Sequence, residues 1–178
     1  MNEMNENRCG CEPQAAPVRL GVITLSDTRT IETDRSGDQA CELLRDSGHE
    51  IVERELIPDE PEKLIELIRR WVAEGRIDVI VTTGGTGIAA RDQTIDAIEK
   101  LLDAELPGFG EHFRRLSFDE IGPSAMLSRA LAGRWGKTAI FCLPGSTGAV
   151  RTGVSQCVLP ILPHVVGLLA PTQEQKSV

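Results

Sequence analysis

Short apolar runs alternate with helical patterns along this chain, and the alternation restricts its fold more than any other feature. Val18–Ser26 and Ile77–Thr83 have the length and β-branched content of buried strands, and Ile51–Ile57 is predicted to be another strand. The segments between them place apolar residues at helical spacing, and Ser36 is predicted to open the first helix in a capping box with Gln39. This pattern predicts βαβ units, and therefore a single three-layer α/β domain around a mainly parallel sheet.

The second half of the chain is predicted to complete the same domain. Its expected elements are two helices, an antiparallel hairpin whose first arm could equally be helical, and a helical stretch kinked by prolines. In chain order they are Thr94–Leu102, Leu106–Leu116, Ala125–Arg134 with Lys137–Leu143, and Ala149–Leu169 with Pro160 and Pro163. We therefore expect one domain over residues 18–169, a flexible N-terminal tail over residues 1–17 and a C-terminal tail over residues 170–178.

Charge and composition exclude several classes of partner. Lysine and arginine number 19 against 27 acidic residues, and a net charge of −8 repels polyphosphate backbones and anionic membrane surfaces. Aromatic residues make up 3% of the chain, too few for a base-stacking platform. The apolar stretch Cys157–Ala170 is broken by prolines and is shorter than the ~20 residues that a membrane-spanning helix needs. We expect no nucleic-acid partner and no membrane association.

The cysteines predict a reducing compartment. There are five, an odd number, and Cys41, Cys142 and Cys157 lie in apolar runs typical of a protein core. The first residues contain no apolar signal-peptide core, so we expect a cytoplasmic protein. Cys9 and Cys11 could bind a soft metal, but two ligands alone do not close such a site.

Ligands of parallel α/β sheets bind beyond the carboxyl ends of the strands. Three loops leave expected strands at that edge, and a fourth follows the strand that ends at Leu143. These loops are Asp27–Arg35, Pro58–Pro61, Gly84–Asp92 and Pro144–Gly148. The chemistry of the chain is expected in them.

The strongest local signal is the sequence TTGGTG at residues 82–87. Glycine permits positive φ, so the N–H groups of Gly84, Gly85 and Gly87 can form an anion-binding nest, and Thr83 and Thr86 add hydroxyl groups. The chain has neither the lysine of a P-loop here nor the spacing of a dinucleotide-binding fingerprint. The alternative interpretation is a tight strand-to-helix turn that binds nothing.

Two aspartates flank this candidate anion site. Asp92 closes the glycine loop, and Asp59 follows the neighbouring strand. A carboxylate beside a phosphate needs a positive charge between them, and Mg²⁺ held by one or two carboxylates and substrate phosphates supplies it. Alternatively, each aspartate only caps the helix that follows it.

Two further segments carry groups that suit an anion. Pro144, Gly145 and Ser146 form a second strand-exit loop, which precedes a helix whose free N–H groups favour negative charge. Ser128 and Arg129 offer a hydroxyl and a guanidinium that can grip a phosphate bidentately. A structural turn and a surface arginine are the competing interpretations.

Taken together, these elements closely resemble those of the MoaB/MogA family of molybdenum-cofactor biosynthesis proteins. The matching sequences cover about Val18 to Leu169, and the later ones favour the MoaB branch. In order they are VITLSDTR, ELIPDE, TTGGTGIAARDQT, LPGFGEHFR, MLSRALAG and CLPGSTGA. The resemblance implies the same three-layer fold and a homo-oligomer, either a trimer or a hexamer.

The resemblance also implies a reaction: binding of molybdopterin and its adenylylation with ATP and Mg²⁺, with release of pyrophosphate. It gives Asp59 and Asp92 catalytic and metal-binding roles. It assigns the phosphate-binding backbone to the TTGGTG loop and the PGS loop, and it places Ser128 and Arg129 near the pterin phosphate.

Two other functions stay open at this point. The chain could carry molybdopterin without adenylylating it, with other enzymes of the pathway as partners. It could instead be an oligomeric scaffold. Phe109, Phe113 and Phe118 cluster in one Gly-broken stretch, and we expect them to lie partly at a subunit interface.

Overall fold

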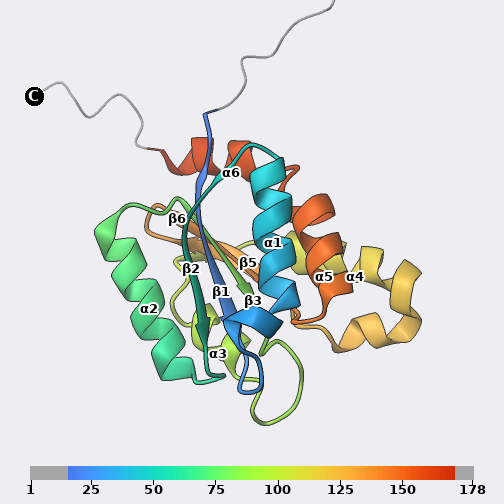
Figure 1. The fold of residues 1–178 in the computed structure, drawn as a ribbon. Coiled ribbons are helices and arrows are strands. Elements are labelled where there is room, and N and C mark those ends of the chain that lie inside the picture. Colours follow the sequence, from blue (N-terminus) through green and yellow to red (C-terminus); the bar gives the residue numbers. More distant parts are fainter. Residues whose placement is uncertain (1–15, 171–178) are drawn as a thin grey trace, which may run out of the picture.

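A six-stranded sheet forms the centre of the molecule (Figure 1). The computed structural model describes residues 16–170, so most of both expected tails, with Cys9 and Cys11, lies outside the described residues. The strands, in their order across the sheet, are β2 (Glu50–Ile57), β1 (Arg19–Leu25), β3 (Val79–Thr83), β6 (Thr138–Leu143), β5 (Leu131–Trp135) and β4 (Ala104–Glu105). The first four are parallel and β5 is antiparallel to both neighbours, which confirms the mainly parallel sheet.

Helices cover both faces of this sheet, as the strand–helix pattern predicts. One face carries α1 (Arg35–Asp46), α4 (Pro107–Ile121), α5 (Thr147–Thr152), the π-helical turn η3 (Gly153–Val158) and α6 (Leu162–Leu169). The other face carries α2 (Pro61–Glu74) and α3 (Thr94–Glu99). The three-layer α/β architecture is therefore confirmed.

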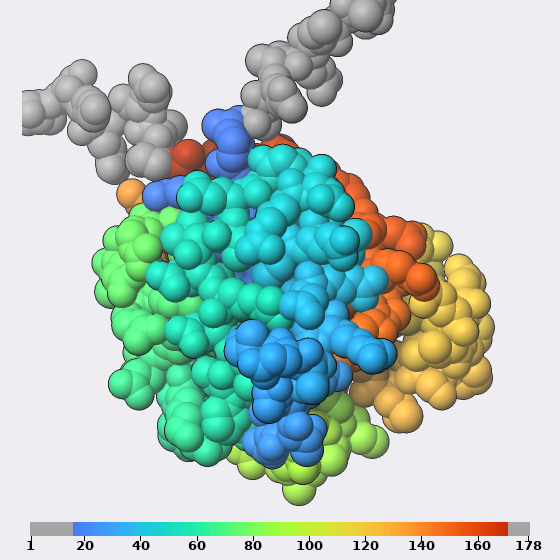
Figure 2. All heavy atoms as spheres, in the orientation of Figure 1, coloured from blue at the N-terminus to red at the C-terminus, as the bar shows by residue number. Residues whose placement is uncertain are grey.

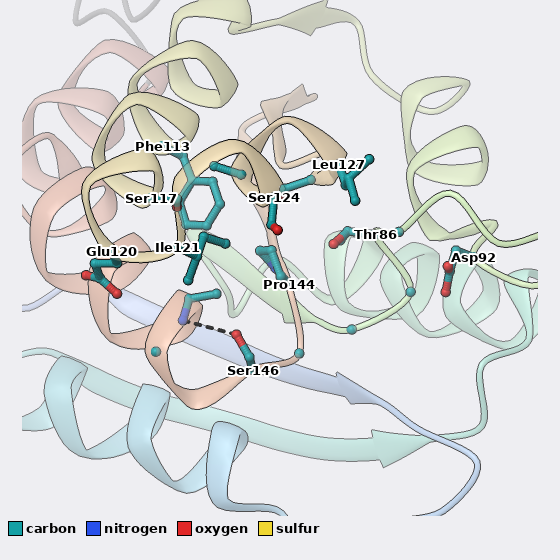
Figure 3. A pocket seen from close by; sticks show the side chains of 18 residues that line it. Thr86, Asp92, Phe113, Ser117, Glu120, Ile121, Ser124, Leu127, Pro144 and Ser146 are labelled. Carbon is teal, nitrogen blue, oxygen red and sulfur yellow. Dashed lines mark hydrogen bonds between the residues drawn. The ribbon is translucent and has the colours of Figure 1, made fainter.

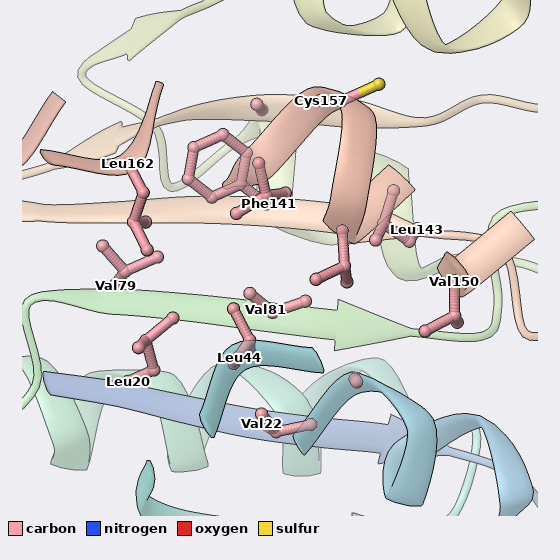
Figure 4. Close-up of a cluster of buried hydrophobic side chains, with 14 of the residues drawn as sticks. Leu20, Val22, Leu44, Val79, Val81, Phe141, Leu143, Val150, Cys157 and Leu162 are labelled. Carbon is pink, nitrogen blue, oxygen red and sulfur yellow. The ribbon is translucent and has the colours of Figure 1, made fainter. Parts of the chain in front are cut away.

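Side-chain alternation along the strands builds one apolar core on each face. Leu20 and Val22 of β1 point towards α1, where Leu44 is fully buried (Figure 4). Ile23, on the opposite face of the same strand, packs in the cluster with α2. Gly21 is required there, because a Cβ at this position would collide with the ring of Trp71.

The expected capping box at Ser36 is wrong. The N-cap of α1 is Asp34, whose Oδ1 accepts the N–H of Gly37 at 3.0 Å. Ser36 lies inside the first turn and donates its hydroxyl to the same carboxylate at 3.1 Å. The ionised carboxylate accepts hydrogen bonds from several donors at once, and it therefore stabilises the first turn of α1 more than a serine hydroxyl would.

The C-terminal helical stretch is interrupted near Pro160, as expected, because α5 and η3 are followed by a turn before α6 begins at Leu162. The hairpin expectation is also met. β5 and β6 pair around Gly136, and the residues before them form the 3₁₀ helix η2 (Gly122–Leu127). In residues 16–170 no single helix is long and apolar enough to cross a membrane. Only the two helical segments Thr147–Val158 and Leu162–Leu169, taken together, reach that length and apolarity, and they are bent by 59° relative to each other.

The expected cluster of exposed phenylalanines does not form. Phe109 and Phe113 are 6% and 1% exposed, and Phe109 packs against the ring of Phe141 with centroids 5.3 Å apart. Only Phe118 stays half exposed. The helical period of α4 turns the first two rings into the core of this chain, so they are not available to a second subunit.

Candidate active site

Two glycine-containing loops meet at the carboxyl ends of β3 and β6. The N–H of Gly84 donates to the carbonyl of Leu143 at 3.0 Å, and the hydroxyl of Thr83 donates to the carbonyl of Pro144 at 3.2 Å. A Cβ on Gly145 would lie 3.4 Å from the Cα of Gly84. The TTGGTG and PGS segments, more than fifty residues apart in sequence, are thus in contact.

The glycines of the first loop are demanded by its geometry. Gly84 and Gly85 have φ of 109° and 63°, values that side chains other than glycine rarely adopt. A Cβ on Gly84 would strike the carbonyl of Leu25, and one on Gly85 would strike the hydroxyl of Thr94. Within residues 16–170, the N–H groups of Gly85, Thr86 and Gly87 donate no hydrogen bond, so the loop presents free donors.

A cleft of about 420 Å³ opens beside these loops (Figure 3). The two glycine loops form one wall, and α4, η2 and the start of α5 form the other. Asp92 lies at one end and Glu120 at the opposite end. Its lining comprises Gly84, Gly85, Thr86, Gly87, Asp92, Phe113, Ser117, Glu120, Ile121, Ser124, Ala125, Leu127, Ser128, Pro144, Gly145, Ser146, Gly148 and Ala149.

Ser146 is the N-cap of α5. Its Oγ accepts the N–H of Ala149 at 3.3 Å, and its carbonyl accepts the N–H of Val150 at 3.0 Å. The expected structural turn is therefore present, and it lies on the wall of the cleft. A turn and a ligand-binding backbone are compatible here, because the first N–H groups of a helix have no intrahelical acceptor.

Neither of the two expected aspartates caps a helix. The N-cap residues of α2 and α3 are Glu60 and Gln93, and neither of these side chains makes a capping hydrogen bond. Asp92 instead accepts the N–H of Ala89 at 2.9 Å through Oδ2, closing the end of the glycine loop. The capping interpretation is wrong for both residues.

Asp59 lies beneath the glycine loop and close to other carboxylates. Its Oδ1 lies 2.7 Å from the position that a Cβ on Gly85 would occupy. Its backbone N–H donates to Asp27 at 2.9 Å, and Asp27 pairs with the exposed guanidinium of Arg91 at 3.1 Å. Burial raises the pKa of Asp59, and the nearby carboxylates of Asp27 and Asp92 raise it further.

This arrangement fits a cation shared with a ligand. In residues 16–170 no group of three histidine, cysteine, aspartate or glutamate side chains is placed to enclose a metal ion. Mg²⁺ needs no such cage, because it commonly uses one or two carboxylates together with phosphate oxygens. The buried hydroxyl of Thr94 lies beside Gly85, and its interaction with the Asp59 carboxylate lowers the pKa of that aspartate, against the effect of burial. The local excess of negative charge suits a hard cation.

Comparison with known proteins places this site in a family. Residues 21–164 match the model of a probable molybdopterin binding domain. The chain belongs to this family.

Its relatives are molybdenum-cofactor biosynthesis proteins. The chain is 46% identical over 149 residues to molybdenum cofactor biosynthesis protein B of Bacillus cereus, and the match covers 83% of this chain and 88% of that protein. The corresponding Bacillus subtilis protein is 47% identical over 156 residues, covering 86% and 92%. These relatives span nearly the whole described domain.

Solved structures agree with this placement. A crystal structure of molybdenum cofactor biosynthesis protein B is 45% identical, has a TM-score of 0.85, and matches 87% of this chain and 97% of that one. The tungsten cofactor synthesizing protein MoaB of Pyrococcus furiosus is 35% identical with a TM-score of 0.78, covering 88% and 99%. The fold and the MoaB/MogA resemblance are thereby confirmed.

Ser128 and Arg129, although adjacent in the sequence, make different contacts in this structure. Ser128 lines the cleft. The guanidinium of Arg129 binds both carboxylate oxygens of Asp96 at 2.9 Å and donates to the carbonyls of Gly87 and Asp92. Its donors thus hold the glycine loop and Asp96, and the position near the pterin phosphate that the family resemblance implies for Arg129 stays a prediction.

The three cysteines of the described residues, Cys41, Cys142 and Cys157, are buried and do not line the cleft. Burial raises the pKa of the Cys142 thiol to about 12 and that of Cys157 to about 11, so neither is a thiolate near neutral pH. Cys41 is buried as well. The core interpretation of these three residues is confirmed.

Sequence reasoning missed the wall of the cleft opposite the glycine loops. Ser117, Glu120 and Ser124 lie there, on α4 and η2. Their only sequence signal is helical phase, since Ser117 and Glu120 are three residues apart and share the face that carries Phe113. Asp27 was within a candidate loop, but nothing in the sequence singled it out.

Proposed function

We propose that this chain binds molybdopterin in the cleft and transfers AMP from ATP to its terminal phosphate. In this reaction a phosphate oxygen of molybdopterin forms a bond to the α-phosphorus of ATP, and the bond from that phosphorus to the bridging oxygen breaks. Pyrophosphate leaves with the electron pair. The observation that carries the proposal is the pair of touching glycine loops, with free N–H donors, next to two partly buried aspartates.

The lining of the cleft suits a ligand in which an aromatic ring adjoins a phosphate group. Phe113, Ile121 and Leu127 supply apolar surface on one wall, and the glycine loops supply backbone donors on the other. A flat heterocycle with a phosphate arm needs this combination of an apolar wall and a few converging polar groups. We place the ring against η2 and α4 and the phosphates against Gly84–Gly87 and Pro144–Ser146.

Group transfer of this kind requires positioning and charge neutralisation and no covalent nucleophile. The backbone donors of the two loops would orient the phosphates and stabilise negative charge on them. Asp59 and Asp92 would hold Mg²⁺ together with the phosphates, and the ion would offset the charge that develops at the transferred group.

Incubation of the protein with molybdopterin, ATP and Mg²⁺, followed by assays for pyrophosphate and adenylylated pterin, tests the proposal. We expect both products in equal amounts. Tight pterin binding without either product would instead identify a carrier of molybdopterin. Failure to bind the pterin at all would leave the scaffold function and overturn the proposal.

The oligomeric state and the partners implied by the family, and the cytoplasmic location expected from the sequence, stay predictions. A homotrimer or homohexamer is tested by light scattering at micromolar concentration. A cytoplasmic location is tested by fractionation of the source cells, and contacts with other enzymes of the pathway by cross-linking.

A further inference from the structure

A buried charge network lies directly behind the second glycine loop. Its centre is Asp34, whose side chain is fully buried. The carboxylate accepts hydrogen bonds from the hydroxyls of Thr24 (2.7 Å) and Ser36 (3.1 Å) and from the N–H of Gly37 (3.0 Å). These donors come from β1 and from the first turn of α1, so Asp34 joins the end of the central strand to the start of a helix.

Two arginines neutralise this carboxylate, and they have different environments. Arg54, on β2, lies 3.1 Å from Asp34 Oδ2 and also binds Asp38 at 2.6 Å. Arg29, in the loop after β1, lies 3.5 Å from Asp34 Oδ1 and donates to Ser36. The other side-chain partner of Arg54 is thus Asp38 of α1, and Arg54 does not line the cleft, whereas Arg29 continues towards it.

The other nitrogen of Arg29 reaches the cleft wall. Its Nη2 donates to the carbonyl of Gly145 at 3.0 Å. Gly145 is one residue before the N-cap of α5 and borders the cleft. On the opposite side, the hydroxyl of Thr83 donates to the carbonyl of Pro144 at 3.2 Å. The PGS loop is therefore held between two donors, one of which is anchored on a buried carboxylate.

We propose that Arg29 is a positioning residue for the anion site: anchored by Asp34, it fixes the peptide at Gly145 and so aims the N–H groups that follow it. The inference rests on the proposed function, in which these N–H groups bind phosphate oxygens. The carbonyl of Gly145 and the N–H of Ser146 belong to the same planar peptide, so a hydrogen bond to one atom sets the direction of the other. Preorganised donors of this kind contribute to binding only while their direction is fixed.

Arg29 and Arg54 provide a matched pair of variants. Both Arg29→Gln and Arg54→Gln remove one cation from the same buried carboxylate, but only the first removes a contact to the loop. Two measurements on the full chain separate the roles: binding of inorganic pyrophosphate by calorimetry, and hydrogen exchange of the amides of Ala149 and Val150, which bond to Ser146. Arg29→Lys, which keeps the charge without the planar fork, is the conservative variant.

We expect Arg29→Gln to weaken pyrophosphate binding about tenfold and to speed exchange at the two amides by a similar factor, the size of one lost hydrogen bond to a charged group. Arg54→Gln should lower the unfolding temperature but leave both readouts at wild-type values. Arg29→Lys should lie between wild type and Arg29→Gln.

Wild-type values in Arg29→Gln would overturn the inference, and so would equal effects of Arg54→Gln, since the network would then act on stability alone. If Arg29→Gln does not fold, the comparison of Arg29→Lys with Arg54→Gln decides by the same criteria. If the wild type itself fails to bind pyrophosphate, the proposed anion site is wrong, while the exchange measurement still decides whether Arg29 holds the loop.

Discussion

At the scale of single residues, the ionised carboxylate of Asp59 lowers the stability of the folded protein when no ligand is bound. Burial and the neighbouring carboxylates raise its pKa, so the folded state is penalised, relative to the unfolded chain, when Asp59 ionises. A group that costs stability and adjoins a cleft is typical of a functional site. A cation bound beside it would reverse this penalty.

We therefore predict that Asp59→Asn leaves the unfolding temperature at pH 7 unchanged or raises it by a degree or two, about 0.5 kcal/mol. Adenylyl transfer should fall ~10²-fold or more, because the negative charge that would hold Mg²⁺ is lost. Thermal unfolding and a pyrophosphate assay check the two parts. A loss of several degrees would show that Asp59 is needed for the fold, contrary to this account.

Asp92 makes a separable prediction. In Asp92→Asn the amide oxygen can still accept the N–H of Ala89, so the turn should persist, and the unfolding temperature should stay near wild type. Turnover should drop ~10²-fold while molybdopterin binding survives. Asp92→Ala, which removes the turn contact as well, is the control and should also lose stability. Wild-type turnover of the asparagine variant would exclude a metal-binding role for Asp92.

At the scale of elements, the conformation of the glycine loop depends on the side chains packed against it, as a comparison of two glycines shows. Gly85 and Gly136 both have φ near 60°. A Cβ on Gly85 would strike Thr94 and lie 2.7 Å from Asp59, whereas a Cβ on Gly136 would meet nothing within 4 Å. The two positions share the same backbone strain and differ in the space around them.

Alanine at each position therefore separates strain from collision. Gly136→Ala should cost about 1 kcal/mol of stability and leave turnover unchanged. Gly85→Ala should cost more and should also abolish most of the activity, because the loop must move away from Asp59 and Thr94. Urea unfolding and turnover of the purified variants provide the comparison. Similar turnover in both variants would mean that the loop geometry at Gly85 is not used by the site.

The same elements show what could be predicted from the sequence. Strands β1, β2, β3 and β6, the glycine loops and the two aspartates are local signals, because each depends on residues adjacent in the chain, and the sequence predicts their places in it. The two-residue strand β4 is not among the predicted elements. The wall formed by Ser117, Glu120 and Ser124 depends on how α4 packs against β5, α5 and η2. The contacts of Arg129 with Asp96 and with the backbone carbonyls of Gly87 and Asp92 join residues that lie 33 or more positions apart in the sequence. Such contacts leave no local pattern.

At the scale of the whole molecule, Asp34 ties together β1, β2 and α1, and through Arg29 it also reaches the loop before α5. Burial alone would raise the pKa of Asp34, but hydrogen bonds from Gly37, Thr24, Arg54 and Ser36 outweigh it and lower the pKa. The folded protein therefore binds the proton less readily than the unfolded chain, in which an aspartate titrates at about 3.9. The ionised network stabilises the fold above that pH and loses this contribution as the pH falls towards the lowered value.

Because ionised Asp34 stabilises the fold, we predict that Asp34→Asn destabilises it in a pH-dependent way. At pH 7 the variant should lose about 3 kcal/mol of unfolding free energy, because two arginines are left without their buried counter-charge. The difference from wild type should stay constant between about pH 5 and 7 and shrink below about pH 4, where Asp34 binds a proton in the unfolded wild-type chain but not yet in the folded protein. Urea unfolding of both proteins across this range measures it, with Asp38→Asn as the control, because Asp38 is exposed and pairs with the same Arg54. A difference independent of pH down to about 3 would mean that the shape of the side chain, and not its charge, holds these elements together.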